Sequence, residues 1–323
     1  VRQVSQFNPE LIVILDQTET PPYEIENEMR EKYPHINFKF VLGDISNRHR
    51  IEPLFQKYQF SMVYHAAAYK HVPLIEENPH EAILVNILGS KNFSTLASKY
   101  KVNRFVMIST DKAVKPTNVM GASKRAAELF VQSLQNSEGN ITKFITTRFG
   151  NVLGSNGSVI PHFKRQIENG GPITITHPDI VRYFMTIPEA CELVLHAGIM
   201  GKGGEIFVFD MGEPVKILDL ANRMIKLSGF EPEVDIKIIY TGLRPGEKLY
   251  EELLSDDAKT LPTHNEKIMI SKDPTMEFAA IEKYTNHIIK AALRGEKVEV
   301  VQILKNIVPE FKSNNSIYEI LDK

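Results

Sequence analysis

The stretch "RFVMISTDKAVKPTNVMGASKR", residues 104–125, decides the fold. It begins as an apolar run, continues as a polar turn, and ends where apolar residues start to recur at helical spacing. This order predicts a strand, a turn and the start of a helix. Such units repeated along a chain predict a parallel sheet with helices on its faces.

The same alternation runs through the first half of the chain. Further apolar runs predict strands at 11–15, 37–42, 61–68 and 141–152. Helical spacing predicts helices near 46–58, 80–100 and 119–136. We therefore expect an α/β fold whose residues 1–152 form a doubly wound parallel, Rossmann-like domain.

The second half is richer in loops. Glycine and proline are frequent in "GNVLGSNGSVIPHF" (150–163), "NGGPITITHPD" (169–179) and "GLRPGEK" (242–248). We expect residues 153–323 to form a smaller substrate-binding lobe, with a strand at 205–212 that returns to the main sheet. Residues 276–311 have a helical pattern and close the chain.

Composition limits the partners of the protein. The chain has 323 residues, 24% of them charged, and a net charge of −2, so no basic field attracts nucleic acid. No apolar run reaches the roughly 18 residues of a membrane span, and we expect no membrane contact from this chain. The one cysteine, Cys191, lies in an amphipathic helical pattern, which predicts a buried structural thiol, a reducing compartment and a cytoplasmic location.

The start of the chain predicts that a preceding part is missing. "VRQVSQFNP" resembles the end of a helix, and no glycine-rich turn of a dinucleotide-binding domain is present. In the doubly wound order, the first strand lies between 11–15 and 61–68, so we expect a gap in the sheet there. We also expect this chain to bind NAD poorly, which leaves open that it is inactive by itself.

Several residues at predicted strand ends are candidates for binding the cofactor. Asp16 can bind both ribose hydroxyls of an adenosine, and its charge disfavours a 2′-phosphate, so NAD is preferred over NADP. Turn capping and tight packing are the alternative interpretations of these positions. The other candidates are Asp44, Ile45, Ala66, Ala67 and Ala68.

The candidate catalytic residues follow the strand at 104–110. Thr110, Asp111 and Lys112 lie at its carboxyl end, where open α/β sheets bind their ligands. Lys124 on the next helix can reach a nicotinamide ribose. Each charge alone is typical of a solvated surface, but their order along a strand, a turn and a helix indicates an active site.

The sequence resembles the extended short-chain dehydrogenase/reductase superfamily and, within it, the CapD-type polysaccharide biosynthesis proteins, which are nucleotide-sugar 4,6-dehydratases. The motifs that carry the resemblance are "AAAYKHVPLIEENPHEAILVNILGS" (66–90), "STDKAVKPTNVMGASKR" (109–125), "RFGNVLGSNGSVIPHF" (148–163), "VRYFMTIPEA" (181–190) and "TGLRPGEKLYEELL" (241–254). Long members of this family carry a membrane-spanning region before the catalytic domain. A full-length form is therefore expected at the cytoplasmic face of the inner membrane.

The resemblance implies a lyase that takes a UDP-sugar, typically UDP-N-acetylglucosamine, and makes a UDP-4-keto-6-deoxy sugar for capsular or surface polysaccharide. Carbon 4 is oxidised by hydride transfer to tightly held NAD, a base removes the proton on carbon 5, and an acid expels the 6-hydroxyl as water. The hydride then returns to carbon 6. A homo-oligomer is also expected, because short-chain dehydrogenases commonly pair through helices, and no metal is implied.

The resemblance also implies roles for the residues. Thr110 hydrogen-bonds the 4-oxygen, Asp111 is the acid for the leaving hydroxyl, Lys112 is the base at carbon 5, and Lys124 holds the nicotinamide ribose. A lysine base needs a lowered pKa, which burial and the charge of Lys124 would provide. Lys70, Asn151, Arg182 and Arg244 match positions that bind the substrate. The two arginines suit a diphosphate, although either one could instead only tie the lobes together.

Met120 stands where most of the superfamily has a catalytic tyrosine, and CapD-type proteins are similar in carrying methionine there. A thioether cannot accept the proton of the 4-hydroxyl. Lys124, Asp111 or a relayed water is then the candidate acceptor, with Tyr69 and Tyr183 as more distant ones. Two other functions remain open: a nucleotide-sugar epimerase or reductase on the same scaffold, and an inactive sugar-nucleotide-binding fragment.

Overall fold

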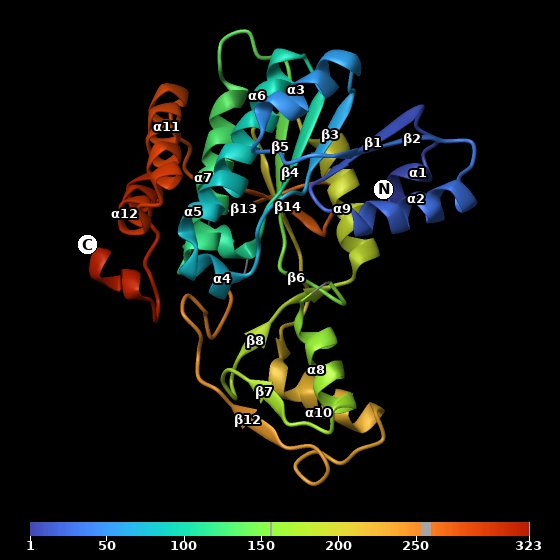
Figure 1. Cartoon of the computed structure of the whole chain (residues 1–323), viewed down its shortest axis with the longest axis vertical. Coiled ribbons are helices and arrows are strands. Elements are labelled where there is room, and N and C mark those ends of the chain that lie inside the picture. The colour runs from blue at the N-terminus through green and yellow to red at the C-terminus, as the bar shows by residue number, and fades with distance from the viewer. Residues whose placement is uncertain (156, 253–259, 323) are drawn as a thin grey trace.

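The computed structural model describes residues 1–155, 157–252 and 260–322. Its central sheet has six strands in the order β13-β14-β10-β5-β4-β3 (Figure 1). Four of them run parallel, which confirms the predicted α/β class. These are β3 (Met62–His65), β4 (Arg104–Ile108), β5 (Lys143–Arg148) and β10 (Ile206–Phe209). Two antiparallel strands close one edge, β14 (Ile268–Ser271) and β13 (Thr260–Pro262).

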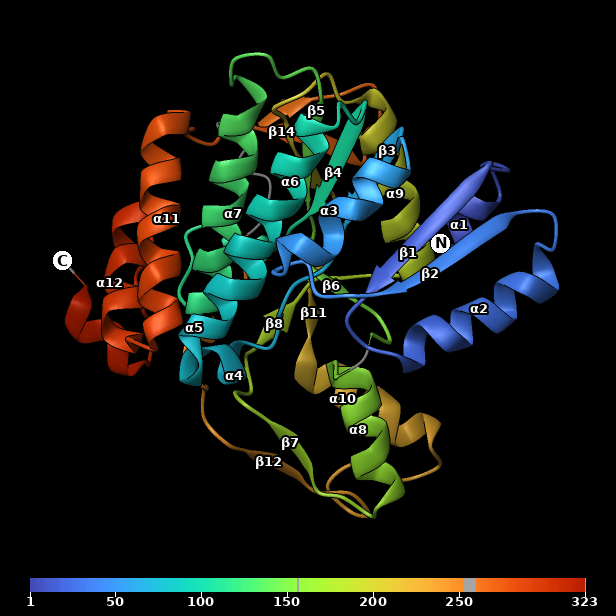
Figure 2. The ribbon, with the colours of Figure 1, turned by 45° about the horizontal axis from the view of Figure 1, so that its top comes forward.

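Two predicted strands form a separate sheet. β1 (Leu11–Asp16) pairs in parallel with β2 (Asn37–Leu42), with Leu11 opposite Asn37. No described strand joins β1 to β3, so the expected gap in the sheet is present. Figure 2 shows this pair apart from the central sheet, with α2 (Thr20–Lys32) beside it. The short helix α1 (Arg2–Ser5) contacts α9 (Ile187–Met200).

Helices cover one face of the central sheet. Phe105 of β4 and Phe144 of β5 pack in one apolar cluster with Phe130 of a long helix. The predicted helix at 80–100 begins as a short α turn, continues as a π-helix and ends as an α-helix. The elements of this layer are α3 (Arg48–Lys57), α4 (Val72–Glu77), α5 (Pro79–Ala82), η1 (Ile83–Gly89), α6 (Ser90–Lys99), α7 (Val119–Gln135), α11 (Phe278–Arg294) and α12 (Lys297–Ile307). A 3₁₀ turn, η3 (Ile317–Leu321), follows them near the end of the chain.

The helix α9 covers the opposite face. Its Leu193 and Val194 pack on Val106 of β4 and Ile145 of β5. Cys191 is exposed on the outer side of α9, so the prediction of a buried thiol is wrong. The reason is geometric: the buried stripe of α9 follows positions 190, 193, 194 and 197, and residue 191 lies outside it.

A smaller lobe with an apolar core of its own lies below the sheet in Figure 1. Phe163 and Ile225 from its two helices pack there around Ile173. Its elements are α8 (Val159–Glu168), β7 (Ile173–Ile175), β8 (Val181–Arg182), β11 (Val215–Lys216), α10 (Ile217–Leu227) and β12 (Ile238–Tyr240). A short parallel pair, β6 (Asn151–Val152) with β9 (Phe184–Met185), lies where the lobe meets the sheet. Among the described residues, no helix has both the length and the apolarity that crossing a membrane requires.

Candidate functional site

The turn after β4 is fixed by its backbone. The amide of Asp111 donates to the carbonyl of Phe149 at 3.1 Å, which ties the turn to the end of β5. Thr110 caps the 3₁₀ helix η2 (Asp111–Ala113), because its hydroxyl accepts from the amide of Lys112 at 3.4 Å. The same hydroxyl donates to Asp111 Oδ1 at 2.8 Å. Three predicted catalytic residues therefore lie together at the carboxyl end of β4.

Asp111 is buried, and its two oxygens differ. Oδ1 accepts from the Thr110 hydroxyl and lies 3.0 Å from Lys112 Nζ. Oδ2 has no hydrogen-bond partner among the described residues. It faces Gly150, where a Cβ would stand 3.3 Å from it. One carboxylate oxygen is thus available to accept a proton or a hydrogen bond.

Lys112 lies between two carboxylates. Its Nζ is 3.0 Å from Asp111 Oδ1 and 3.4 Å from Glu251 Oε1. Burial disfavours the charged amine, but the charges of Asp111 and Glu251 outweigh burial and raise the pKa of Lys112. The expected lowering of this pKa by burial and Lys124 is therefore wrong. The sequence could not show that Glu251, 139 positions away, faces Lys112.

Alternating charges continue from Glu251 toward the smaller lobe. Glu251 Oε1 lies 3.4 Å from Arg182 Nε, and Arg182 Nη2 lies 3.4 Å from Glu247 Oε1. The same Glu247 oxygen is 3.2 Å from Arg244 Nη2. Arg182 and Arg244, both predicted to bind substrate, are thus joined to Lys112 through two glutamates that the sequence prediction missed.

The first turn of α7 lies close to the turn that follows β4. Asn118 caps the helix by accepting from the amide of Gly121 at 2.8 Å. A Cβ on Gly121 would lie 2.1 Å from the carbonyl oxygen of Lys112, so only glycine fits there. One turn later Lys124 is buried and donates from Nζ to the Ile108 carbonyl at 2.7 Å. Burial lowers the pKa of Lys124 to about 8, against the opposing effect of Glu128.

Met120 belongs to the apolar core rather than to the polar site. It is 3% exposed and packs in the cluster between α7 and the sheet. Its position therefore provides no acid or base.

The candidate cofactor residues stand at three strand ends. Asp16 Oδ1 accepts from the amide and the hydroxyl of Thr18, at 2.8 and 2.7 Å. Asp44 Oδ1 accepts from the amide of Ser46 at 2.8 Å, so both aspartates cap turns. Ile45 is buried against Gly89.

The loop after β3 is held by a buried asparagine that the sequence prediction missed. Asn86 Oδ1 accepts from the amide of Tyr69 at 2.8 Å, and Nδ2 donates to the Tyr69 carbonyl at 3.1 Å. Nδ2 also lies 3.0 Å from the Ser123 hydroxyl on α7. The exposed Ala66 and Ala67, with the half-buried Ala68, are therefore fixed relative to the helix that carries Lys124.

Two further predicted residues lie around this site. Asn151 of β6 donates from Nδ2 to the Tyr183 carbonyl at 3.2 Å. Lys70 is exposed next to the loop after β3. Asn156, Leu253 and Leu254 of the quoted motifs lie outside the described residues.

The segment that follows α12 supports the turn that carries Arg244. The amide of Gly246 donates to the backbone carbonyl of Asn314 at 2.7 Å. The side-chain Nδ2 of Asn314 donates to the Glu247 carbonyl at 3.0 Å. Asn315 Nδ2 donates to the Leu243 carbonyl at 2.7 Å. The amide of Asn314 in turn donates to the carbonyl of Thr117, just before α7. This segment thus connects the Arg244 turn to the entrance of α7.

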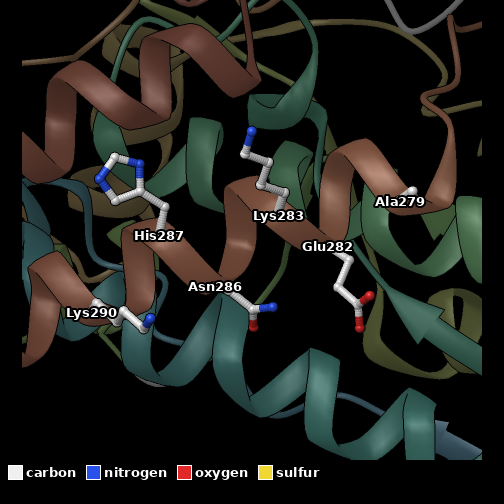
Figure 3. A pocket seen from close by; sticks show the side chains of 6 residues that line it. All are labelled: Ala279, Glu282, Lys283, Asn286, His287 and Lys290. Atoms are coloured by element: carbon white, nitrogen blue, oxygen red, sulfur yellow. The ribbon is translucent and has the colours of Figure 1, made fainter.

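A shallow pocket elsewhere contains none of the predicted residues. Figure 3 shows its lining side chains projecting from successive turns of α11. Lys91 of α6 donates to Asn286 Oδ1 at 2.6 Å, and His287 lies 3.7 Å from Glu299 of α12. Asn286 and His287 thus contact the neighbouring helices α6 and α12. The lining residues are Ala279, Glu282, Lys283, Asn286, His287 and Lys290.

The family described as "Polysaccharide biosynthesis protein" matches residues 1–273. The chain belongs to this family. This match covers the central sheet, the turn after β4 and the two arginines, and it confirms the resemblance stated from the motifs.

Individual relatives agree with this family. The chain is 57% identical over 255 residues to "Capsular polysaccharide biosynthesis protein CapD" of Staphylococcus aureus, covering 79% of this chain and 42% of that protein. It thus spans less than half the length of this curated relative. A "UDP-glucose 4-epimerase" of Rickettsia canadensis is 35% identical over 302 residues, covering 89% of this chain and 86% of that protein. The solved structure of "Pen from Bacillus thuringiensis" is 36% identical with a TM-score of 0.77, covering 85% of this chain and 83% of that one.

Proposed function

We propose that the protein is a nucleotide-sugar 4,6-dehydratase, a lyase that converts UDP-N-acetylglucosamine into a UDP-4-keto-6-deoxy sugar for capsular or surface polysaccharide. The observation that carries this proposal is the row of contacts from Asp111 and Lys112 through Glu251 to Arg182. It joins two groups that can transfer protons to a guanidinium that suits a diphosphate. Membership of the polysaccharide biosynthesis family and the likeness to CapD support the same assignment.

NAD is the proposed cofactor. The exposed alanines after β3 leave room for a flat ring, and the buried amine of Lys124 suits a ribose hydroxyl. Asp16 at the end of β1 would bind the adenosine ribose and disfavour a 2′-phosphate. NAD, when bound, supplies a hydride acceptor for carbon 4 and a hydride donor for carbon 6.

The side chains of the site have distinct proposed tasks. Thr110 hydrogen-bonds the 4-oxygen, while Asp111 and Lys112 carry the two proton transfers at carbons 5 and 6. Met120 has no acid–base capacity, so the 4-hydroxyl proton needs another acceptor. Lys124 suits this task because a pKa of about 8 leaves a usable fraction of neutral amine near physiological pH.

The test combines the protein, together with any residues that its gene encodes beside this sequence, with UDP-N-acetylglucosamine and NAD and follows the sugar by NMR. The 323-residue chain is assayed beside it. A 6-methyl doublet together with a hydrated 4-ketone is the expected product signature. Lys112→Met is expected to abolish this product and to keep UDP binding within a fewfold range. Unchanged sugar, with full binding of UDP, would overturn the proposal in favour of a binding fragment.

A second candidate is a nucleotide-sugar epimerase or reductase. The Rickettsia relative favours it, because that protein matches this chain over most of both lengths. The Asp111–Lys112 pair argues against it, since 4-epimerisation needs no proton transfer at carbons 5 and 6. Formation of the N-acetylgalactosamine isomer in the same NMR assay would establish the epimerase instead.

Two properties of the assembled protein are part of the proposal. We propose a homo-oligomer at a cytoplasmic location, with any full-length form held at the inner membrane. Light scattering of the purified protein and fractionation of cells that express the complete gene test these two properties. A monomer, or a protein secreted from the cell, would contradict them.

A further inference from the structure

Glu251 connects the two halves of the candidate site. Its side chain is 4% exposed, and Oε1 lies 3.4 Å from both Lys112 Nζ and Arg182 Nε. A single buried oxygen thus faces an ammonium that is predicted to be catalytic and a guanidinium that is predicted to bind the substrate.

The backbone holds Glu251 in this place. Val181 of β8 donates from its amide to the Leu249 carbonyl at 3.2 Å, and Val181 forms a parallel bridge with Tyr250. Arg182 Nη1 also lies 3.4 Å from the Leu249 carbonyl. Glu251 therefore follows a segment that is paired with β8, and its position does not depend on its side-chain contacts alone.

We propose that Glu251 is a positioning residue that keeps Lys112 as an ammonium, so that Lys112 donates the proton to the leaving 6-hydroxyl while Asp111 accepts the proton from carbon 5. This inference rests on the proposed dehydratase function and reverses the roles that the resemblance implied. Asp111 suits the accepting role because Oδ2 is buried and has no partner among the described residues. Lys112 suits the donating role because carboxylates flank it on two sides.

The elimination step balances with these two groups. The proton on carbon 5 passes to the Asp111 carboxylate, and its electron pair forms the bond between carbons 5 and 6. The bond from carbon 6 to oxygen breaks, and the departing hydroxide takes a proton from Lys112 and leaves as water. When hydride adds to carbon 6, Asp111 returns its proton to carbon 5. Over the whole reaction the substrate releases one proton from the 4-hydroxyl and takes one from Lys112, so no outside acid is consumed.

The charged groups that act on Lys112 define the test. They are Asp111 from its own turn, Glu251 from the segment paired with β8, and Arg182 from β8. Glu251→Gln removes one negative charge and keeps the shape of the side chain. Glu252→Gln is the matched control, because Glu252 pairs with Lys115 and Lys248 instead.

The first measurement needs no substrate. Lysine ε-carbons are labelled with ¹³C, the Lys112 signal is assigned from its loss in Lys112→Arg, and its titration is followed between pH 8 and 11. In the unmodified protein we expect Lys112 to stay charged beyond the ordinary lysine pKa of 10.5. In Glu251→Gln we expect the titration about one pH unit lower, and no change in Glu252→Gln. Two results would overturn the proposed task of Glu251. One is that Lys112 loses its proton below pH 10 in the unmodified protein. The other is that Lys112 titrates at the same pH in the unmodified protein and in Glu251→Gln.

The second measurement separates donor from acceptor. If Lys112 donates its proton, the alkaline limb of the pH–kcat profile moves to lower pH in Glu251→Gln. Movement of the acidic limb instead would make Lys112 the base and overturn the proposed roles. A protein that makes no 4-keto-6-deoxy sugar would refute the dehydratase function and the donor role with it, while the NMR titration still decides whether Glu251 holds Lys112.

Discussion

Replacing Lys124 by methionine is expected to stabilise the protein while it removes a proposed catalytic amine. The Lys124 side chain is buried, and burial lowers its pKa from 10.5 to about 8. Because one pH unit corresponds to about 1.4 kcal/mol, holding this ammonium in the folded state costs roughly 3 kcal/mol at neutral pH. Methionine has a similar length and carries no charge into the interior.

The gain is smaller than this cost, because methionine leaves the Ile108 carbonyl without its donor. Such a loss is worth about 1 to 2 kcal/mol. The free energy of unfolding of Lys124→Met at pH 7 is therefore expected to exceed that of the unmodified protein by about 1 to 2 kcal/mol. The dehydratase activity is expected to fall below detection.

The pH dependence has a definite sign. A lysine whose pKa is lower in the folded state binds fewer protons there than in the unfolded chain between pH 8 and 10.5. The unmodified protein therefore gains stability relative to Lys124→Met as pH rises through this range. Urea unfolding at pH 7 and pH 10 measures the difference, with the exposed Lys226→Met as a control. Two results would refute the reasoning: Lys124→Met less stable than the unmodified protein by more than about 1 kcal/mol at pH 7, or a difference in their free energies of unfolding that is the same at pH 7 and pH 10.

Three further changes test the supports of the site. Gly121→Ala would place a Cβ 2.1 Å from the Lys112 carbonyl oxygen, so we expect about a hundredfold loss of kcat. Gly139→Ala is the control, because its Cβ meets no atom within 4 Å; the positive φ of Gly139 strains that loop before β5 but is expected to leave kcat unchanged. Equal kcat in the two variants would contradict the close approach of Gly121 to Lys112. Asn314→Ala removes the hydrogen bond to the Glu247 carbonyl. Calorimetry is expected to show severalfold weaker binding of UDP and an unchanged melting temperature. A lowered melting temperature would indicate a general loss of stability instead. Burial raises the pKa of Glu76, so the free energy of unfolding is expected to fall as pH rises above 4.5. In Glu76→Gln this dependence on pH is expected to disappear. The same dependence in both proteins would exclude Glu76 as its source.

The four parallel strands of the central sheet could be predicted because each is a short apolar run that ends at a polar residue. The two antiparallel edge strands, β13 and β14, were not predicted. The turn with Thr110, Asp111 and Lys112 was found for the same reason, since it follows such a run directly. The family resemblance added the predicted substrate-binding residues Arg182 and Arg244 but gave no contact between them. Local pattern therefore placed the parallel strands and this turn, while the chemical roles of the turn's residues stay predictions.

The remaining features depend on contacts that are distant in sequence. Glu251 is one of two adjacent glutamates, and only the pairing of its segment with β8 brings it, rather than Glu252, to Lys112. The raised pKa of Lys112 follows from that contact and could not be read from residues 109–125. Cys191 shows a different error, because it was predicted to be buried and is exposed. An amphipathic pattern predicts a helix, but it does not fix whether a residue at the edge of the apolar stripe is buried.

The hydrogen bonds made by Asn314 and Asn315 have a consequence for how this protein is cut, fused or recombined. The family match ends at residue 273, yet the turn that carries Arg244 is supported by Asn314 and Asn315, which lie beyond that end. A chimaera that joins the first 273 residues to the tail of another family member would keep every matched motif and still present Arg244 on a different support. Differences in nucleotide preference between such relatives can therefore originate in tails that sequence comparison of the shared region leaves out.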